Sequence, residues 1–107
     1  MIEEWKDILG YEGLYQVSNF GNVKSVRFNK EKLLLPQTNS KGYHFVALCD
    51  KTKRKQMQIH QLVAIAFLNH IPCKMELVIN HINFDKKDNN VSNLEIVTNR
   101  ENSNRKH

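Results

Sequence analysis

One stretch near the C-terminus constrains the fold of this chain more than any other feature. Residues 78–102 read VINHINFDKKDNNVSNLEIVTNREN, in which a polar loop at 83–90 separates two short apolar runs. The second run leads into TNRE at 98–101, which fits a helix capping box. We therefore expect a strand, a loop, a second strand and a helix. This order folds back on itself, so that His81 at the end of the first strand faces Asn102 in the first turn of the helix.

The residues before this stretch predict a first, β-rich sheet. Two runs with alternating apolar residues, at 14–19 and 23–28, flank Phe20-Gly21, which is typical of a tight hairpin turn. The segment Trp5–Gly10 is expected to pack beneath this sheet as a short apolar anchor. The run Leu33–Leu35 ends at a proline, which cannot donate to a β-ladder, so we expect an edge strand or an extended loop.

A second ribbon and a core helix are expected in the middle of the chain. After a polar loop at 37–42, strands are predicted at 43–49 and 54–59. Residues 62–68 are apolar on every side and of high helix propensity, which favours a short helix inside the core.

Size and composition exclude several classes of protein. A chain of 107 residues has room for one domain with one core. No apolar run approaches the roughly 20 residues of a membrane span, and the N-terminus lacks a signal peptide, so we expect a cytoplasmic protein. Cys49 and Cys73 are isolated thiols, which indicates neither a zinc site nor a disulfide framework.

The positive charge is concentrated in the middle of the chain. Of the net charge of +5, residues 24–58 supply nine basic side chains against two acidic ones. Such a patch favours a phosphate backbone as partner, although a merely solvated surface would have the same composition. The expected DNA contacts are Lys24, Arg27, Lys41, Lys51, Lys53, Arg54 and Lys55, with Arg105 in the tail.

The C-terminal stretch resembles the HNH nucleases, the ββα-metal endonucleases of phages and mobile introns. The matching residues are Asn80-His81 at the end of a strand, Asn93 in an S-N-L segment, and Asn102 on the following helix. Upstream, HQLVA at 60–64 is similar to the helix that precedes this motif in many phage members. WKDILGYEGLYQVSNFGNVKSV at 5–26 resembles the short N-terminal module often found ahead of such nuclease domains.

This resemblance implies an α+β fold, with N-terminal antiparallel β-hairpins followed by a core helix and a C-terminal ββα-metal motif. Residues 1–58 would contact double-stranded DNA and residues 59–107 would hold the nuclease motif, within one compact unit. The implied activity is that of a metal-dependent DNA endonuclease of the phage or homing type, which nicks one strand as a monomer. Several members carry a C-terminal helix-turn-helix, which the sequence up to His107 does not show. We therefore expect relaxed sequence specificity, or targeting through a partner.

The resemblance also assigns roles to single residues. His81 would be the general base, because a histidine accepts a proton near neutral pH. Asn80 and Asn102 would bind one divalent cation, Mg²⁺ or Mn²⁺. Asn93 would fix the loop between the strands and hold His81 in its working orientation.

One departure from the family leaves alternatives open. Some relatives have Asp at the position of Asn80, and Mg²⁺ usually requires at least one carboxylate. We therefore expect weak metal binding in the absence of DNA, unless Asp85 or Asp88 turns in from the loop. Of the other histidines, His60 either supports the site or is buried with its bonds satisfied. His44, His70 and His107 receive no role, although His107 could replace a ligand, and Asn89-Asn90 is expected to cap the loop.

Two other classes of function remain open. The neutral Asn80 is compatible with a DNA-binding module that has lost its catalytic activity. The basic patch alone is compatible with an interaction domain that binds an acidic protein.

Overall fold

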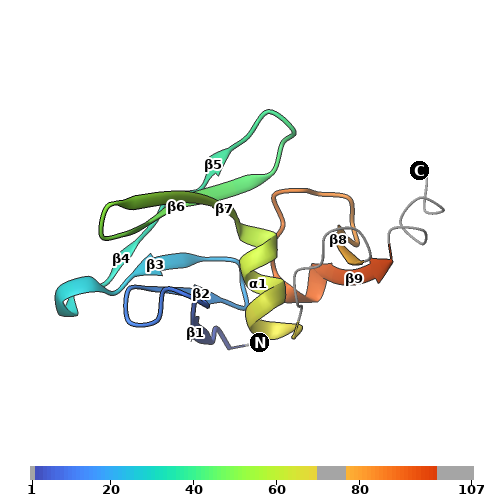
Figure 1. Cartoon of the computed structure of the whole chain (residues 1–107). Coiled ribbons are helices and arrows are strands. Elements are labelled where there is room, and N and C mark those ends of the chain that lie inside the picture. Colours follow the sequence, from blue (N-terminus) through green and yellow to red (C-terminus); the bar gives the residue numbers. More distant parts are fainter. Residues whose placement is uncertain (1, 70–76, 99–107) are drawn as a thin grey trace.

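Three small antiparallel sheets lie around a single helix, α1 (Ile59–Phe67), in the part of the chain that the structure describes (Figure 1). The structure is a computed structural model, and it describes residues 2–69 and 77–98. Helix α1 packs against strands of all three sheets. The predicted α+β class is therefore confirmed, while the expected last helix lies outside the described residues.

The first sheet has four strands in sequence order: β1 (Trp5–Asp7), β2 (Tyr15–Ser18), β3 (Val23–Ser25) and β4 (Lys32–Leu33). The predicted hairpin is confirmed as β2 and β3, with Val17 opposite Val23. Both of these valines are buried, because successive strand residues alternate between the core and the opposite face. The predicted edge strand is confirmed for Leu33, which lies in β4, whereas Leu34 and Leu35 follow the strand.

Two predictions about this sheet were wrong. Residues 5–7 do not lie beneath the sheet but form its edge strand β1, paired with β2. The strand expected to reach residue 28 ends at Ser25, and a 3₁₀ turn, η1 (Arg27–Asn29), follows. Phe28 and Asn29 have φ angles of 57° and 58°. This left-handed conformation cannot continue a strand.

The second sheet consists of β5 (Gln37–Thr38), β6 (His44–Asp50) and β7 (Lys53–Gln58). The predicted ribbon is confirmed, with Asp50 paired to Lys53 at its tip. The predicted loop at 37–42 was wrong for its first two residues, which pair with β6. Ile59, expected to end the ribbon, is the first residue of α1.

Helix α1 begins three residues earlier than expected, so His60 lies in its first turn. Leu62, Val63 and Ala64 are buried, as predicted for a core helix. The Nζ of Lys6 in β1 donates to the carbonyl oxygen of Ala66, 3.1 Å away, in the last turn of the helix. Among the described residues, no helix has the length and apolar character that crossing a membrane requires.

The third sheet is the predicted pair of C-terminal strands, β8 (Leu77–His81) and β9 (Leu94–Thr98). They run antiparallel, with His81 opposite Leu94 and Asn80 opposite Glu95. A polar loop and a short 3₁₀ turn, η2 (Val91–Asn93), join them. Figure 1 shows this hairpin beside α1, on the side away from the turn of the β6–β7 ribbon.

Candidate active site and DNA-contacting surface

His81 ends strand β8, as the sequence predicted, and lies against the loop that joins the two strands. Only 5% of the residue is exposed. Its Nε2 lies 2.9 Å from the Oδ1 of Asn89. Because an amide oxygen can only accept, Nε2 must carry the hydrogen in this arrangement. The Nδ1 atom is then the nitrogen with a lone pair, and it is the one that can take a proton.

His60 and Tyr43 complete a cluster of rings around His81. The ring of His60 lies 5.1 Å from that of His81, and the ring of Tyr43 lies 5.1 Å from His60 and 5.8 Å from His81. Burial, together with the neighbouring His81, lowers the pKa of His60 from 6.5 to about 4. His60 is therefore neutral at physiological pH. Its Nδ1 is buried without a hydrogen-bond partner among the described residues, so this histidine is buried but not satisfied.

Asn93, at the end of η2, forms hydrogen bonds to two residues of the polar loop between β8 and β9. Its Oδ1 accepts a hydrogen bond from the backbone N–H of Asn83, 3.0 Å away. Its Nδ2 donates to the Oδ1 of Asn83 and to the backbone oxygen of Asp88, both at 2.9 Å. One buried side chain thus joins the two ends of the polar loop.

Asn80 does not share the surroundings of His81. Its Nδ2 donates to the Oε1 of Glu95 on the neighbouring strand, at 3.0 Å. Successive residues of a strand point to opposite faces, and the different partners of Asn80 and His81 follow this rule. Asn102, the second expected metal ligand, lies outside the described residues, as do His70 and His107.

The two aspartates of the loop are engaged in the loop's own structure. The Oδ1 of Asp85 accepts from the backbone N–H of Lys87 at 3.0 Å, and the Oδ2 of Asp88 accepts from the Nδ2 of Asn83 at 3.0 Å. Within residues 2–69 and 77–98, no three His, Cys, Asp or Glu side chains gather as a metal site would require.

Sequence reasoning missed two residues of this site. Asn89 was expected only to cap the loop, yet it is 4% exposed and bonds to His81. Glu95 received no role, although the strand register places its carboxylate beside Asn80. The register of β8 and β9, which the structure supplies, identifies Glu95 as the residue opposite Asn80. No local pattern marks Asn89, because its contact depends on the path of the loop.

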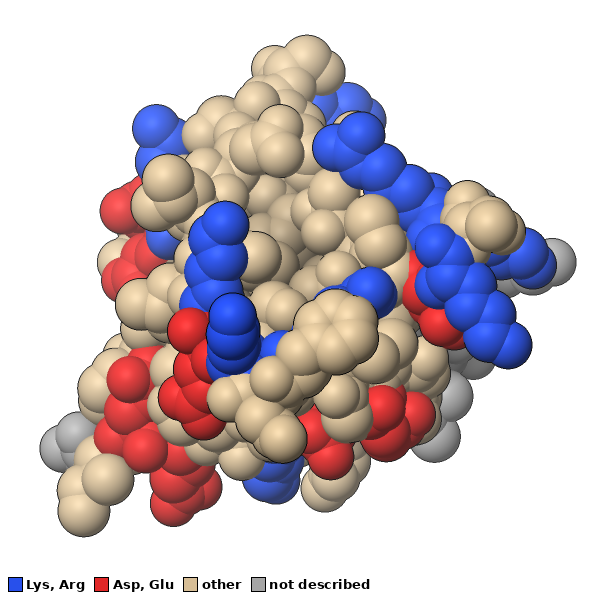
Figure 2. Space-filling view, turned by 90° about the vertical axis from the view of Figure 1, so that its left-hand side faces the viewer, with Lys and Arg blue, Asp and Glu red and all other residues tan. Residues whose placement is uncertain are grey.

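The basic residues expected to contact DNA occupy different environments. Lys51, Lys53, Arg54 and Lys55 are exposed on the β6–β7 ribbon, and Lys41 is exposed in the turn before β6. Figure 2 shows the face of the molecule that includes the ribbon's turn, with basic side chains standing around a hollow and acidic ones gathered below it. Arg105 lies outside the described residues.

Lys24 and Arg27 are engaged within the first sheet instead. The Nζ of Lys24 lies 3.3 Å from a carboxylate oxygen of Glu31 and 4.2 Å from the ring centroid of Trp5. The guanidinium carbon of Arg27 lies 5.1 Å from the ring centroid of Tyr15. Both cations are therefore less available to a phosphate than those of the ribbon.

The turn before β6 reaches the loop of the candidate site. The Nζ of Lys86 donates to the backbone oxygen of Lys41 at 2.9 Å and lies 5.0 Å from the ring centroid of Tyr43. The ribbon sheet and the polar loop are thus in direct contact.

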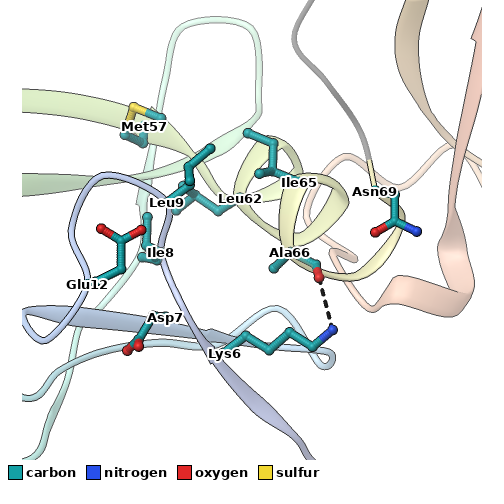
Figure 3. Close-up of a pocket in the computed structure, with 10 residues that line it drawn as sticks. All are labelled: Lys6, Asp7, Ile8, Leu9, Glu12, Met57, Leu62, Ile65, Ala66 and Asn69. Carbon is teal, nitrogen blue, oxygen red and sulfur yellow. Dashed lines mark hydrogen bonds between the residues drawn. The ribbon is translucent and has the colours of Figure 1, made fainter.

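A pocket of about 650 Å³ lies elsewhere, between β1, the loop after it, β7 and α1 (Figure 3). Its walls are mostly apolar, with Ile8, Leu9 and Leu62 among them, and the hydrogen bond from Lys6 to Ala66 lies at one side. None of its lining residues belongs to the set expected to cut or bind DNA.

Comparison with protein families matches nearly the whole chain in two segments. The NUMOD4 motif matches residues 3–49, and the HNH endonuclease family matches residues 58–104. These segments contain the stretches at 5–26, 60–64 and 78–102 whose resemblance the sequence had indicated.

Individual relatives come from viruses and phages. An uncharacterized HNH endonuclease of Acanthamoeba polyphaga mimivirus is 46% identical over 103 residues, which are 94% of this chain and 25% of the relative. The DNA endonuclease I-HmuI of Bacillus phage SP01 is 44% identical over 95 residues, 89% of this chain and 52% of the relative. The chain therefore spans from a quarter to about half of the length of these relatives.

The fold has a counterpart among solved structures. The structure described as DNA binding and cleavage by the HNH homing endonuclease I-HmuI has a TM-score of 0.82 and 42% sequence identity to this chain. The likeness covers 94% of this chain and 56% of that chain. Together with the strand–loop–strand motif that presents His81, these matches show that the chain belongs to the HNH endonucleases, with a NUMOD4 motif ahead of the HNH segment.

Proposed function

We propose that this protein is a metal-dependent DNA endonuclease of the phage homing type, which nicks one strand with His81 as general base. The observation that carries the proposal is the 2.9 Å contact between the Nε2 of His81 and the Oδ1 of Asn89. This contact fixes the tautomer and leaves Nδ1 to take a proton from water. The position of His81 in the family's motif supports the same role.

The rest of the site would orient this base. Asn93 holds the loop that carries Asn89, and the rings of His60 and Tyr43 lie against the imidazole. Because Asn80 and His81 point to opposite faces of the hairpin, the scissile phosphate must lie at the end of β8 to be reached by both.

One divalent cation, Mg²⁺ or Mn²⁺, would be held by Asn80 and Asn102. The donor set fits such an ion, because the Nδ2 of Asn80 is turned to Glu95, so its amide oxygen points away from that carboxylate. The negative charge that two neutral ligands lack would come from the scissile phosphate. When bound, the cation would neutralise charge on the phosphate and on the leaving oxygen.

The DNA would lie along the exposed cations of the β6–β7 ribbon, with residues 1–58 contacting it and residues 59–107 cutting it. A monomer with one such site would cut one strand per encounter, in the cytoplasm of an infected cell. Two findings support DNA as the substrate, since the relative I-HmuI is a DNA endonuclease and its solved structure concerns DNA binding and cleavage.

A DNA-binding module without activity is the second candidate. Two observations favour it: His81 is 5% exposed, and Asn80 is already bonded to Glu95. Because His81 is nearly buried, little of its imidazole is open to the water that a general base must deprotonate.

A plasmid assay separates the two candidates. Supercoiled plasmid is incubated with Mg²⁺ or Mn²⁺ and wild-type protein, His81→Ala, or the matched control His44→Ala. Conversion to open circle by wild type and His44→Ala, but not by His81→Ala, supports the nicking enzyme. Retarded but intact plasmid with all three proteins supports the binding module and rules out the proposed activity.

A further inference from the structure

The turn between β2 and β3 packs directly against the residue that bonds to His81. Gly21 in this turn has a φ of +88°, and a Cβ placed on it would lie 2.9 Å from the Cβ and from the backbone oxygen of Asn89. It would also lie 3.0 Å from the carbonyl carbon of Asn89. Only a residue without a side chain allows the two backbones to come this close.

A hydrogen bond joins the same two segments. The backbone N–H of Val91 donates to the backbone oxygen of Asn19, 2.8 Å away. The loop is therefore held at two points: Gly21 packs against Asn89 itself, and Asn19 accepts a hydrogen bond from Val91, two residues later. Both contacts come from the N-terminal sheet, about 70 residues away in sequence.

Side-chain hydrogen bonds of Ser18 and Asn19 hold the turn itself. The Oγ of Ser18 accepts from the backbone N–H groups of Phe20 and Asn22, at 3.2 and 3.1 Å. The side chain of Asn19 accepts from the N–H of Glu4 at 2.8 Å and donates to the oxygen of Ile2 at 3.1 Å. Ser18 and Asn19 are both buried.

We propose that the β2–β3 turn positions the base of the nuclease, by holding Asn89 where its amide oxygen accepts from the Nε2 of His81. This inference rests on the proposed function, because it assumes that His81 is the base. The N-terminal module then does more than contact DNA: it is part of the support of the catalytic site. Asn89 and Gly21 are positioning residues, since they act through His81.

The chain offers a matched pair of variants for the test. Gly21→Ala introduces a methyl group that clashes with Asn89. Gly10→Ala places the same methyl group on nearly the same backbone, with φ +87°, but nothing lies within 4 Å of it. The comparison therefore separates the clash with Asn89 from the general cost of alanine at a positive φ. Asn89→Ala removes the acceptor directly, and gives a second variant if Gly21→Ala does not fold.

Two readouts are made on the full chain. The first is the rate of nicking at saturating plasmid, together with DNA affinity measured by retardation. The second is the imidazole N–H proton of His81 in ¹⁵N-labelled protein, which needs neither DNA nor metal. A hydrogen-bonded, buried N–H gives a slowly exchanging signal, whereas an imidazole without an acceptor does not.

We expect Gly21→Ala and Asn89→Ala to lose this signal and to nick about 10- to 100-fold more slowly, with unchanged DNA affinity. Gly10→Ala should match the wild type in both readouts. In the double variant, the two reductions in rate should not multiply, because both act through one bond.

Equal behaviour of Gly21→Ala and Gly10→Ala would overturn the inference, and so would fully multiplicative reductions in the double variant. If the wild type does not nick at all, the proposed function fails instead. The imidazole signal would then still decide whether the turn holds Asn89 against His81.

Discussion

The two buried histidines, His60 and His81, lie with their rings 5.1 Å apart and yet use their nitrogens differently. His81 bonds to Asn89, whereas the Nδ1 of His60 has no partner among the described residues. A buried polar atom without a hydrogen-bond partner lowers the stability of the folded protein. Burial and the neighbouring His81 lower the pKa of His60, so protonation of this side chain opposes folding.

The stability of the protein should decrease in acid because of His60. Its pKa is about 4 in the folded protein and 6.5 ordinarily, so the unfolded chain binds more protons between these values. The contribution of His60 to the free energy of unfolding therefore falls as the pH drops from about 6.5 to about 4, by about 3 kcal/mol at most. Urea unfolding of wild type and His60→Phe at pH 7.5 and 4.5 measures this. The variant should lose less stability than wild type, and equal losses would contradict the assignment.

Relief of backbone strain at Phe28 should stabilise the fold. Phe28 is 89% exposed and has a φ of 57°, so it bears the cost of a left-handed conformation with little packing in return. Asn adopts this conformation more readily, and Phe28→Asn should raise the free energy of unfolding by about 0.5–1 kcal/mol. Phe28→Ala, which keeps the strain, is the control. A gain for alanine as large as that for asparagine would show that strain is not the cause.

At the scale of single residues, the sequence predicted where His81 lies in its strand and that Asn93 fixes the loop, but not which side chain contacts His81. The position of His81 at a strand end follows from the apolar run before it, and the structure has it there. The bond to Asn89 could not be predicted, because it depends on a contact with Gly21 in another sheet. The partner of Asn80 follows from strand register, which the sequence leaves undetermined until both strand ends are known.

Among the described elements, the β6–β7 ribbon carries most of the exposed cations that we propose to contact a phosphate backbone. Its exposed cations project from both faces, since Lys53 and Lys55 alternate with Arg54 along β7. The elements themselves were mostly predicted from alternating apolar residues. Their ends were not, because Phe28 adopts a left-handed conformation and residues 37–38 form a strand by pairing with residues 44–45 across the loop between them.

Neutralising the ribbon should weaken DNA binding in a salt-dependent way. Removing one cation that neutralises a phosphate lowers the slope of log affinity against log salt by about 0.9. Lys53→Gln combined with Lys55→Gln should therefore reduce the slope by about 2, while the nicking rate at saturating DNA is kept. Retardation assays at several salt concentrations measure the slope.

Lys24→Gln is the matched control for the ribbon. It removes the same charge, but from a side chain that is 12% exposed and paired with Glu31. A decrease in slope as large for Lys24→Gln as for one ribbon lysine would contradict the assignment of the DNA-contacting surface.

In the whole molecule, α1 holds the three sheets together, and the N-terminal sheet meets the nuclease loop through Asn19 and Gly21. The order of elements and the α+β class could be read from sequence, because each hairpin and the helix has a local pattern. The contact between the first sheet and the last loop could not, since nothing local encodes it. The family matches cover both halves of the chain, with the NUMOD4 motif first and the HNH segment second, which is the order that the sequence predicted.

Metal binding should require the whole complex of protein and DNA. Asn80 and Asn102 are neutral, so a hard cation gains little from them without a phosphate. Titration of Mg²⁺ or Mn²⁺ into free protein, followed by calorimetry, should give little heat. The same titration with a non-cleaved DNA analogue present should give clear binding. Strong binding to the free protein would mean that Glu95 or another carboxylate completes the site alone.

The central claim is that His81 is the base, and chemical rescue tests it most directly. Single-turnover nicking of a DNA duplex is followed for wild type and for His81→Ala, with and without added imidazole. We predict that His81→Ala binds DNA as tightly as wild type and nicks at least about 100-fold more slowly. Added imidazole should then raise its rate. Nicking by His81→Ala at the wild-type rate would contradict the claim.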